Sequence, residues 1–243
     1  MTKMYEARNH ILIHTGYMEP IEHCHMAAHI MIAVDGDMKV YANESEQVCR
    51  GMLIPSGVSH KADVNGKSVL VFLYDGTTNV ARKIQEVQIL SDMVCEKIVT
   101  SYLDFEKKKD IEFYPQFEKC VLEQIDIKES QSLITDERIL VAIDYIRARL
   151  SEKITCQEVA DAVALSQGRL SHLFKEQVGM TFASYLVYQR ILRVYTEILH
   201  GKSITETALQ AGFSSSGHFA DVNRRVFGLS ASSITKDLEF AKV

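Results

Sequence analysis

The chain has 243 residues, 47% of them hydrophobic, and a formal net charge of −5, which suits a globular protein of two domains. Its first ten residues lack the apolar core of a secretory signal, and no apolar run approaches the roughly 20 residues needed to span a bilayer. The five cysteines are odd in number and form no C-x-x-C pair, which is typical of a reducing compartment. We therefore expect a cytoplasmic protein with no membrane partner.

Residues 10–75 have the pattern of β-strands joined by tight turns. Short apolar or alternating runs such as HILIHTG, HIMIAV and VLVFLY are separated by DGD, NES and NGK. Such runs with closely spaced turns are typical of antiparallel sheets. The fold class that we predict is α+β and multidomain, and it begins with an antiparallel β-barrel or sandwich over residues 1–78.

Six of the nine histidines lie within the first sixty residues. His23 and His25 stand two apart, so that on a strand both project from one face, and His29 can share that face. His60 ends the turn PSGVSH. The pattern resembles the two sequence motifs of the cupin barrel, and the resemblance is carried by Gly16, His23, His25, His29, Gly36, Gly51, Pro55, Gly57, His60 and Asn65.

In cupins, two histidines and a carboxylate of the first motif and one histidine of the second motif bind a divalent metal. The resemblance thus implies a metal site of His23, His25, His29 and His60, with His29 at the place of the carboxylate. Four imidazoles favour Zn, Ni, Cu or Fe over Mg or Ca, which prefer oxygen. His10 and His14 are interpreted as non-ligands. The alternative is that these histidines line a pocket for an organic effector.

From Asn79 the apolar spacing changes to three and four residues, which predicts an amphipathic helix. Its apolar positions are Val80, Ile84, Val87, Leu90, Val94 and Ile98. Pro115 is expected to open a second helix, and the charged run 106–110 is interpreted as a loop between the two. We expect residues 79–125 to pair two copies of the chain, and residues 126–132 to form a polar linker.

Residues 154–230 contain one pattern twice. EVADAVALS followed by LSHLFKEQVGMT is echoed by ETALQAGFS followed by HFADVNRRVFGLS. Each copy predicts a short helix, a tight turn and a second helix. Thr155 with Glu158, and Ser203 with Glu206, fit a capping box at the start of the first helix.

The two copies align position by position. The small residues Ala160 and Ala208 stand 48 positions apart, where the two helices of a copy approach each other, and Ala164 and Gly212 hold the turns. Gly179 and Gly228 are expected to end the second helices. One helix-turn-helix is more often ordinary packing than a DNA reader, but a duplicated one favours DNA binding.

Residues 133–240 resemble the DNA-binding domain of the AraC/XylS family of transcription regulators. The resemblance is carried by LSHLFKEQVGMTFASYL, AGFSSSGHF and FGLSASSI. It implies an all-helical domain of seven helices within residues 133–243, in which a long helix over residues 182–200 holds two recognition helices in successive major-groove segments. The implied partners are promoter DNA, a second copy of the chain and RNA polymerase, and family precedent favours activation.

The recognition helices are predicted at residues 167–177 and 216–226, with one apolar stripe each. The DNA-facing residues that follow from the outer faces and from the resemblance are Gln167, Gly168, Ser171, His172, Lys175, Ser216, Gly217, His218, Ala220, Asp221 and Arg224. The resemblance assigns Lys175 and Arg224 to phosphates and the others mainly to bases. Asp221 stands where an arginine is usual, and it either accepts from a cytosine amino group or pairs with Arg224 or Arg225.

The charge distribution fits a division of labour. Residues 133–243 carry thirteen basic and twelve acidic side chains, whereas residues 1–132 carry fourteen and twenty. We expect modest, salt-sensitive DNA affinity. The function that we predict is a one-component transcription regulator that senses a metal or a small molecule. The alternative is a metal-dependent cupin enzyme, such as a dioxygenase or isomerase, but the duplicated motif favours the regulator, and four histidines can fill a tetrahedral shell and leave only weak reactivity. We predict no catalytic residues.

Overall fold

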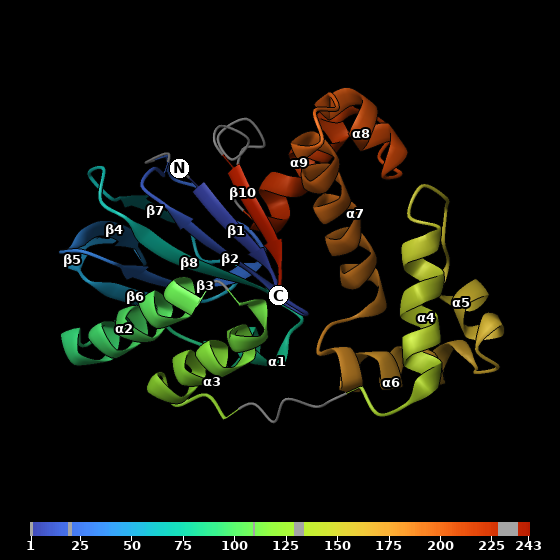
Figure 1. The fold of residues 1–243 in the computed structure, drawn as a ribbon, viewed down its shortest axis with the longest axis horizontal. Helices are drawn as coiled ribbons and strands as arrows, with labels where there is room; N and C mark the ends of the chain where they lie inside the picture. The colour runs from blue at the N-terminus through green and yellow to red at the C-terminus, as the bar shows by residue number, and fades with distance from the viewer. Residues whose placement is uncertain (1, 19–20, 109, 129–133, 228–237) are drawn as a thin grey trace. The chain divides into compact units, whose positions relative to one another are not determined.

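The computed structural model describes residues 2–18, 21–108, 110–128, 134–227 and 238–243 (Figure 1). The chain divides into two compact units. Unit 1 contains residues 1–130, 225–229 and 236–243, and unit 2 contains residues 131–224 and 230–235.

Unit 1 is built on two β-sheets. The larger sheet has seven strands, in the order β10 (Leu238–Lys242), β1 (Thr2–Glu6), β2 (His10–Thr15), β8 (Val69–Asp75), β3 (Ala27–Ala33), β6 (Gly51–Ile54) and β9 (Gln88–Leu90). The smaller sheet has three strands, in the order β5 (Ser45–Cys49), β4 (Met38–Ala42) and β7 (His60–Asp63). Neighbouring strands are antiparallel except β1 and β10, which are parallel.

The sheets do not close into a barrel, so the expectation of a closed cupin-like barrel is wrong. Closure requires a continuous ladder of hydrogen bonds around the axis. Within the described residues, the pairing outside the named strands is limited to one isolated antiparallel bridge between His23 and His60. The larger sheet instead ends at β9 and β10, and both of these strands come from outside the residue range 1–78 expected for the barrel.

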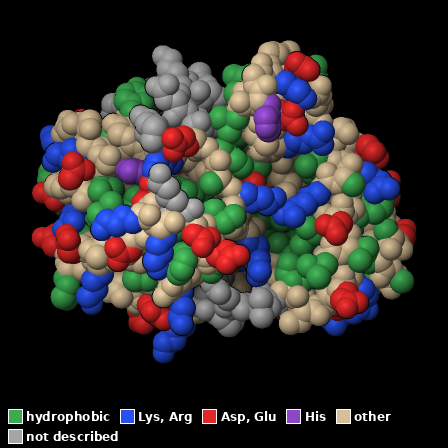
Figure 2. All heavy atoms as spheres, in the orientation of Figure 1, with side chains coloured by type: hydrophobic (Ala, Val, Ile, Leu, Met, Phe, Trp, Pro, Cys, Tyr) green, Lys and Arg blue, Asp and Glu red, His purple; other side chains and the backbone are tan. Residues whose placement is uncertain are grey.

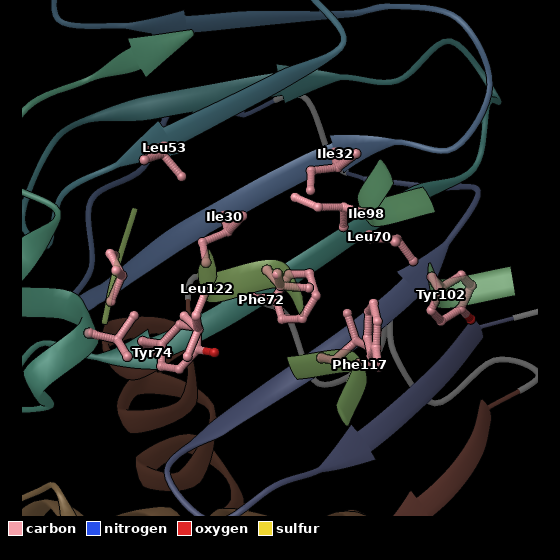
Figure 3. Close-up of a cluster of buried hydrophobic side chains, with 14 of the residues drawn as sticks. Ile30, Ile32, Leu53, Leu70, Phe72, Tyr74, Ile98, Tyr102, Phe117 and Leu122 are labelled. Carbon is pink, nitrogen blue, oxygen red and sulfur yellow. The ribbon is translucent and has the colours of Figure 1, made fainter. Parts of the chain in front are cut away.

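Helices cover one face of the larger sheet, as Figure 1 shows for α2 (Asp92–Lys108) and α3 (Tyr114–Gln124). Alternate residues of the central strands, such as Ile30 and Ile32 of β3, point into this layer together with Phe72 of β8. Figure 3 shows these side chains around Tyr102 and Phe117 of the helices. Each such fully buried side chain contributes roughly 1.5–3 kcal/mol, so this layer stabilises unit 1.

The region from Asn79 to Ile98 is not one helix, which corrects the expectation from periodicity. Helix α1 (Asn79–Lys83) ends at Ile84, whose backbone is extended, and residues 88–90 form β9 against β6. The apolar spacing therefore records the burial of successive short elements. Residues 106–108 belong to α2 rather than to a loop.

The second predicted helix is confirmed. A short 3-10 helix, η1 (Ile111–Phe113), leads into α3, and Pro115 lies in the first turn of α3 as expected. The expected linker starts later than residue 126, because Ile127 is buried in the core of unit 1. Residues 129–133 lie outside the described residues.

The described part of unit 2 is all-helical. The part of it that the structure describes contains six of the seven implied helices: α4 (Glu137–Ala148), α5 (Cys156–Ala162), α6 (Gln167–Val178), α7 (Phe182–Leu199), α8 (Ile204–Gln210) and α9 (Ser216–Phe227). The long helix expected at residues 182–200 is α7, and the predicted recognition helices are α6 and α9. Across the described ranges, every helix is too short or too polar to cross a membrane.

Candidate nucleic-acid interface and histidine cluster

The two helix pairs of unit 2 share the same backbone hydrogen bonds. In the first pair, the amide of Leu165 donates to the carbonyl of Ala160 at 2.9 Å, and in the second pair the amide of Phe213 donates to Ala208 at 3.0 Å. Both alanines are fully buried. The expected equivalence of the two copies is therefore confirmed at the level of single bonds.

Both turns place one residue in the left-handed region of backbone space. Ala164 has φ 52° and Gly212 has φ 83°. A Cβ atom on Gly212 would lie 2.7 Å from the carbonyl oxygen of Leu150. The second turn therefore requires glycine, whereas the first tolerates alanine at a conformational cost of roughly 1–2 kcal/mol.

The starts of the first helices differ more than the sequence indicates. Thr155 and Glu158 form the complete capping box at the start of α5. Ser203 accepts a hydrogen bond from the amide of Glu206 at 3.2 Å, but the carboxylate of Glu206 accepts from Gln210 of the same helix. The second copy thus has the N-cap hydrogen bond of Ser203, but within the described contacts Glu206 does not return a bond to the backbone of Ser203.

Helix α6 presents a polar outer face. Leu170, Leu173 and Phe174 are buried, whereas Gln167, Gly168, Ser171 and His172 are exposed and Lys175 is half-buried. The Ser171 hydroxyl lies 3.4 Å from the Cys156 thiol of α5, and His172 Nδ1 lies 3.6 Å from Glu176. Sequence reasoning missed Arg169, an exposed cation in the first turn of α6. Its place outside the apolar stripe was the available signal.

Helix α9 presents the matching face of the second copy. Phe219 and Val222 are buried, whereas Gly217, His218, Ala220, Asp221 and Arg224 are exposed and Ser216 is half-buried. One interpretation of Asp221 from the sequence was an ion pair with Arg224 or Arg225. Among the described residues, Asp221 forms no ion pair with either arginine. Gly228, the expected end of this helix, lies outside the described residues.

The second copy also contains a buried polar pair. Asn223 occupies a core position, is fully buried, and accepts a hydrogen bond from the Tyr195 hydroxyl at 2.9 Å. The equivalent residue of the first copy is Phe174, whose ring packs against Phe182 and Tyr185. A buried amide is tolerated when it is hydrogen-bonded, so Tyr195 compensates for the missing aromatic ring.

Four histidines meet where the two sheets of unit 1 come together. His29 lies in β3, His60 begins β7, and His23 and His25 lie in the segment before β3. One ligand nitrogen from each of His23, His25 and His60 lies within 4.8 Å of the others. The ring of His29 has its centroid 4.6 Å from those of His25 and His60. The structure therefore places the four predicted side chains beside one another, with His29 outside the group of three.

Hydrogen bonds orient these rings. The Nδ1 atoms of His23 and His60 lie 2.7 Å and 2.8 Å from the carbonyl oxygens of Ile21 and Val58, so both rings carry the proton on Nδ1 and keep a lone pair on Nε2. His25 differs, because its Nδ1 accepts from the amide of Ala27 at 3.2 Å. Binding of a cation at His25 Nε2 requires this ring to change its tautomer.

Burial keeps three histidines of the cluster, His25, His29 and His60, neutral. Loss of solvation lowers the pKa of His25 to about 2 and that of His60 to about 4, and it holds the pKa of His29 well below its usual range. The buried nitrogens His25 Nε2, His29 Nδ1 and His60 Nε2 have no hydrogen-bond partner among the described residues. Neutral imidazoles with unused nitrogens are the form that binds transition metals, so the residues fit such an ion.

His10 and His14 take no part in this cluster. His10 Nε2 lies 2.7 Å from the Tyr114 hydroxyl of α3, and His14 Nδ1 lies 2.8 Å from the Tyr102 hydroxyl of α2. These histidines connect the sheet to the covering helices.

Comparison with known proteins identifies the helical unit. Residues 159–237 match the family model of a helix-turn-helix domain. The chain is 33% identical over 92 residues to an uncharacterised HTH-type transcriptional regulator of Staphylococcus aureus, a match that covers 37% of this chain and 12% of the relative. It is 32% identical over 97 residues to the transcriptional activator RhaS of Escherichia fergusonii, which covers 40% and 35%. The chain thus spans only a minor part of these relatives.

A solved structure extends the likeness to both units. The crystal structure of ToxT from Vibrio cholerae matches 97% of this chain and 96% of its own, with a TM-score of 0.50 at 10% identity. At that identity the likeness concerns the fold alone.

The duplicated helix pair and these matches identify a helix-turn-helix domain of the kind found in transcription regulators. This helix-turn-helix region is similar to those of transcription regulators such as RhaS, and it follows a β-rich N-terminal unit.

Proposed function

We propose that this chain is a sequence-specific DNA-binding transcription regulator, in which α6 and α9 enter successive segments of the major groove. The observation that carries the proposal is the duplication of one helix pair with the same internal hydrogen bonds and an exposed polar face on each second helix. Recognition helices of helix-turn-helix proteins contact base edges through such faces.

The distribution of surface charge favours DNA binding through individual contacts between cations and phosphates over attraction by a uniformly basic surface. Figure 2 shows basic and acidic side chains interspersed on the face that it presents. Cations on the outer faces of the recognition helices include Arg169, Lys175, Arg224 and Arg225. Each phosphate that such a cation neutralises releases counterions, so binding weakens with salt.

Selection of bound sequences from random DNA by the full chain tests the proposal, followed by a salt titration of the selected site. Replacing Lys175 or Arg224 by alanine should weaken binding to all sequences alike and reduce the slope of log affinity against log salt by about 1. Lys39→Ala, in the exposed part of β4, is the matched control and should change neither quantity. Recovery of no preferred sequence would contradict sequence-specific binding.

The histidine cluster supports a finer proposal: unit 1 senses a divalent transition metal, Zn, Ni, Cu or Fe. The three buried nitrogens without a partner carry this proposal, since buried polar atoms normally have one. A bound ion would supply a Lewis acid that holds several imidazoles together. His23 and His60 present lone pairs from fixed rings, and His29 brings β3 of the larger sheet to the site. Occupancy would therefore tie the two sheets to each other.

Elemental analysis of the untagged protein tests metal binding. About one transition metal per chain is expected in the parent, and none in the double variant His25→Ala, His60→Ala. His200→Ala, at an exposed position of unit 2, is the control and should keep the metal. Absence of metal from the parent after incubation with Zn, Ni, Cu and Fe would support the alternative, in which the histidines line a pocket for an organic effector.

The helical segment suits pairing of two chains, and we include a homodimer in the proposal. Met93 and Leu103 of α2 are 66% and 42% exposed, so a second copy of the chain could cover apolar surface on this helix. Replacing both by glutamate should convert a dimer to a monomer in light scattering. A monomeric parent would contradict this part. The proposal also includes recruitment of RNA polymerase and activation of transcription rather than repression. Expression of a reporter gene placed behind the selected site measures whether transcription rises or falls.

A further inference from the structure

His218 is held in one orientation at the start of α9. Its Nδ1 accepts a hydrogen bond from the amide of Ser214 at 3.2 Å and lies 3.0 Å from the Ser214 hydroxyl. Its ring stands edge-on to Phe213, with centroids 5.5 Å apart. Because a backbone amide only donates, Nδ1 carries no proton. The ring proton is therefore on Nε2, and Nε2 is a donor.

Asp221 provides an acceptor next to this donor. It follows His218 by three positions on the same helix, so the two side chains are neighbours on the surface of α9. Both are exposed, and Asp221 has no ion pair with Arg224 or Arg225, all four being described residues. A carboxylate that lies unpaired on a recognition helix approaches DNA phosphates at an electrostatic cost. It contributes to binding only where a base offers a hydrogen-bond donor.

We propose that His218 and Asp221 together read one G·C base pair in the segment of the major groove that α9 enters. His218 Nε2–H donates to O6 or N7 of guanine, and the Asp221 carboxylate accepts from the N4 amino group of cytosine. Guanine offers only acceptors in the major groove and cytosine only this donor, so the two side chains match the two bases. The inference rests on the proposed DNA-binding function and names the base pair that the second copy selects.

An A·T pair is a poorer partner for the same two side chains. Its donor, the adenine N6 amino group, stands between two acceptors, adenine N7 and thymine O4. The carboxylate of Asp221 would meet one of these acceptors on either side of the amino group. In a G·C pair the cytosine amino group has an acceptor on one side only, and His218 binds that acceptor.

The rigidity of His218 strengthens the selectivity. A side chain that is already fixed by its contacts loses little conformational entropy on binding. In the first copy, the position equivalent to His218 is Arg169, and the position equivalent to Asp221 is His172. The two copies should therefore read different bases.

The test is a selection of random DNA by the full chain, followed by affinity measurements on the selected site and on sites with each base pair replaced. In the parent, one position of the DNA segment that α9 contacts should prefer G·C over A·T by roughly five- to 150-fold. Asp221→Ala should abolish that preference and bind the A·T site more tightly than the parent does. His218→Phe keeps the contact with Phe213 but loses the donor, and it should also reduce the preference.

Asp144→Asn, which removes an exposed carboxylate on α4, is the matched control and should keep the full preference. A parent that selects DNA without this preference, or an Asp221→Ala variant that retains it, overturns the inference while the proposed DNA binding stands. A parent that selects no sequence at all overturns the proposed function and the inference with it. A fold check of each variant by circular dichroism separates lost contacts from lost structure.

Discussion

The two helix-turn-helix copies of unit 2 share a backbone but differ in how each is stabilised. The first has a complete capping box, an aromatic core around Phe174 and an alanine in the left-handed turn. The second has a simple N-cap, a buried polar pair of Tyr195 and Asn223, and a glycine in the turn. A duplicated motif thus preserves its geometry while its stabilising contacts change.

The difference indicates where each copy is vulnerable. Apolar packing tolerates small changes of shape, whereas a buried hydrogen bond depends on both partners being present. The second copy should therefore be the more sensitive to substitutions in its core and its turn, and the first copy to loss of its cap. The four predictions below compare the copies in order of decreasing effect.

Gly212→Ala should destabilise unit 2 by about 2–4 kcal/mol, because it combines a positive φ with a Cβ atom 2.7 Å from the carbonyl oxygen of Leu150. Chemical denaturation of the full chain measures the loss. Gly201→Ala, at another positive-φ glycine but with open space around it, isolates the conformational strain. Equal losses in the two variants would show that the contact with Leu150 is unimportant.

Tyr195→Phe should cost about 1–3 kcal/mol, since it removes the donor to the buried Asn223 side chain. The double variant Tyr195→Phe, Asn223→Leu should recover part of that loss, because it replaces both partners by apolar groups. A double-mutant cycle from thermal denaturation gives the coupling. Strict additivity of the two changes would contradict a compensating pair.

Removal of the caps compares the copies directly. Thr155→Ala and Ser203→Ala should each cost about 1 kcal/mol, and the loss should be greater for Thr155, whose side chain takes part in the complete capping box. Urea denaturation of both variants measures the difference. A greater loss for Ser203 would reverse the order of stability assigned to the two helix starts.

Ala164→Gly should stabilise the protein by about 0.5 kcal/mol, because relief of the left-handed alanine slightly exceeds the added freedom of glycine in the unfolded chain. The melting temperature should rise by a degree or two at most. Destabilisation would mean that the Ala164 methyl group makes a packing contact worth more than its strain.

The sequence predicts unit 2 well because its signals are local. Caps, turn residues and apolar stripes lie within a few positions of one another, and α6, α7 and α9 begin at the expected residues. The histidine cluster was also predictable, through the motif spacing of His23, His25 and His60. In both cases one short pattern fixes the relevant neighbours.

Contacts between distant segments could not be predicted in the same way. The apolar run from Val80 to Ile98 fits a helix, but β9 forms because its residues pair with β6, some 35 positions earlier in the chain. The open edge between the two sheets depends likewise on which strands pair. The tautomer of His218 depends on the backbone of Ser214, whose position follows from the turn geometry. The local sequence pattern does not contain information on these contacts between distant segments or on this tautomer.

The parallel pairing of β1 with β10 has a consequence for how the protein folds in the cell. Thr2 pairs with Leu238, so nearly the whole length of the chain separates the partners. During synthesis β1 emerges before β10, and its outer edge lacks this partner until translation has passed through unit 2. An unpaired edge strand invites association with other chains, and such a long loop closes slowly. Chaperone dependence and slow maturation of the sheet should accompany this topology, whereas unit 2, built from local contacts, can fold as it leaves the ribosome.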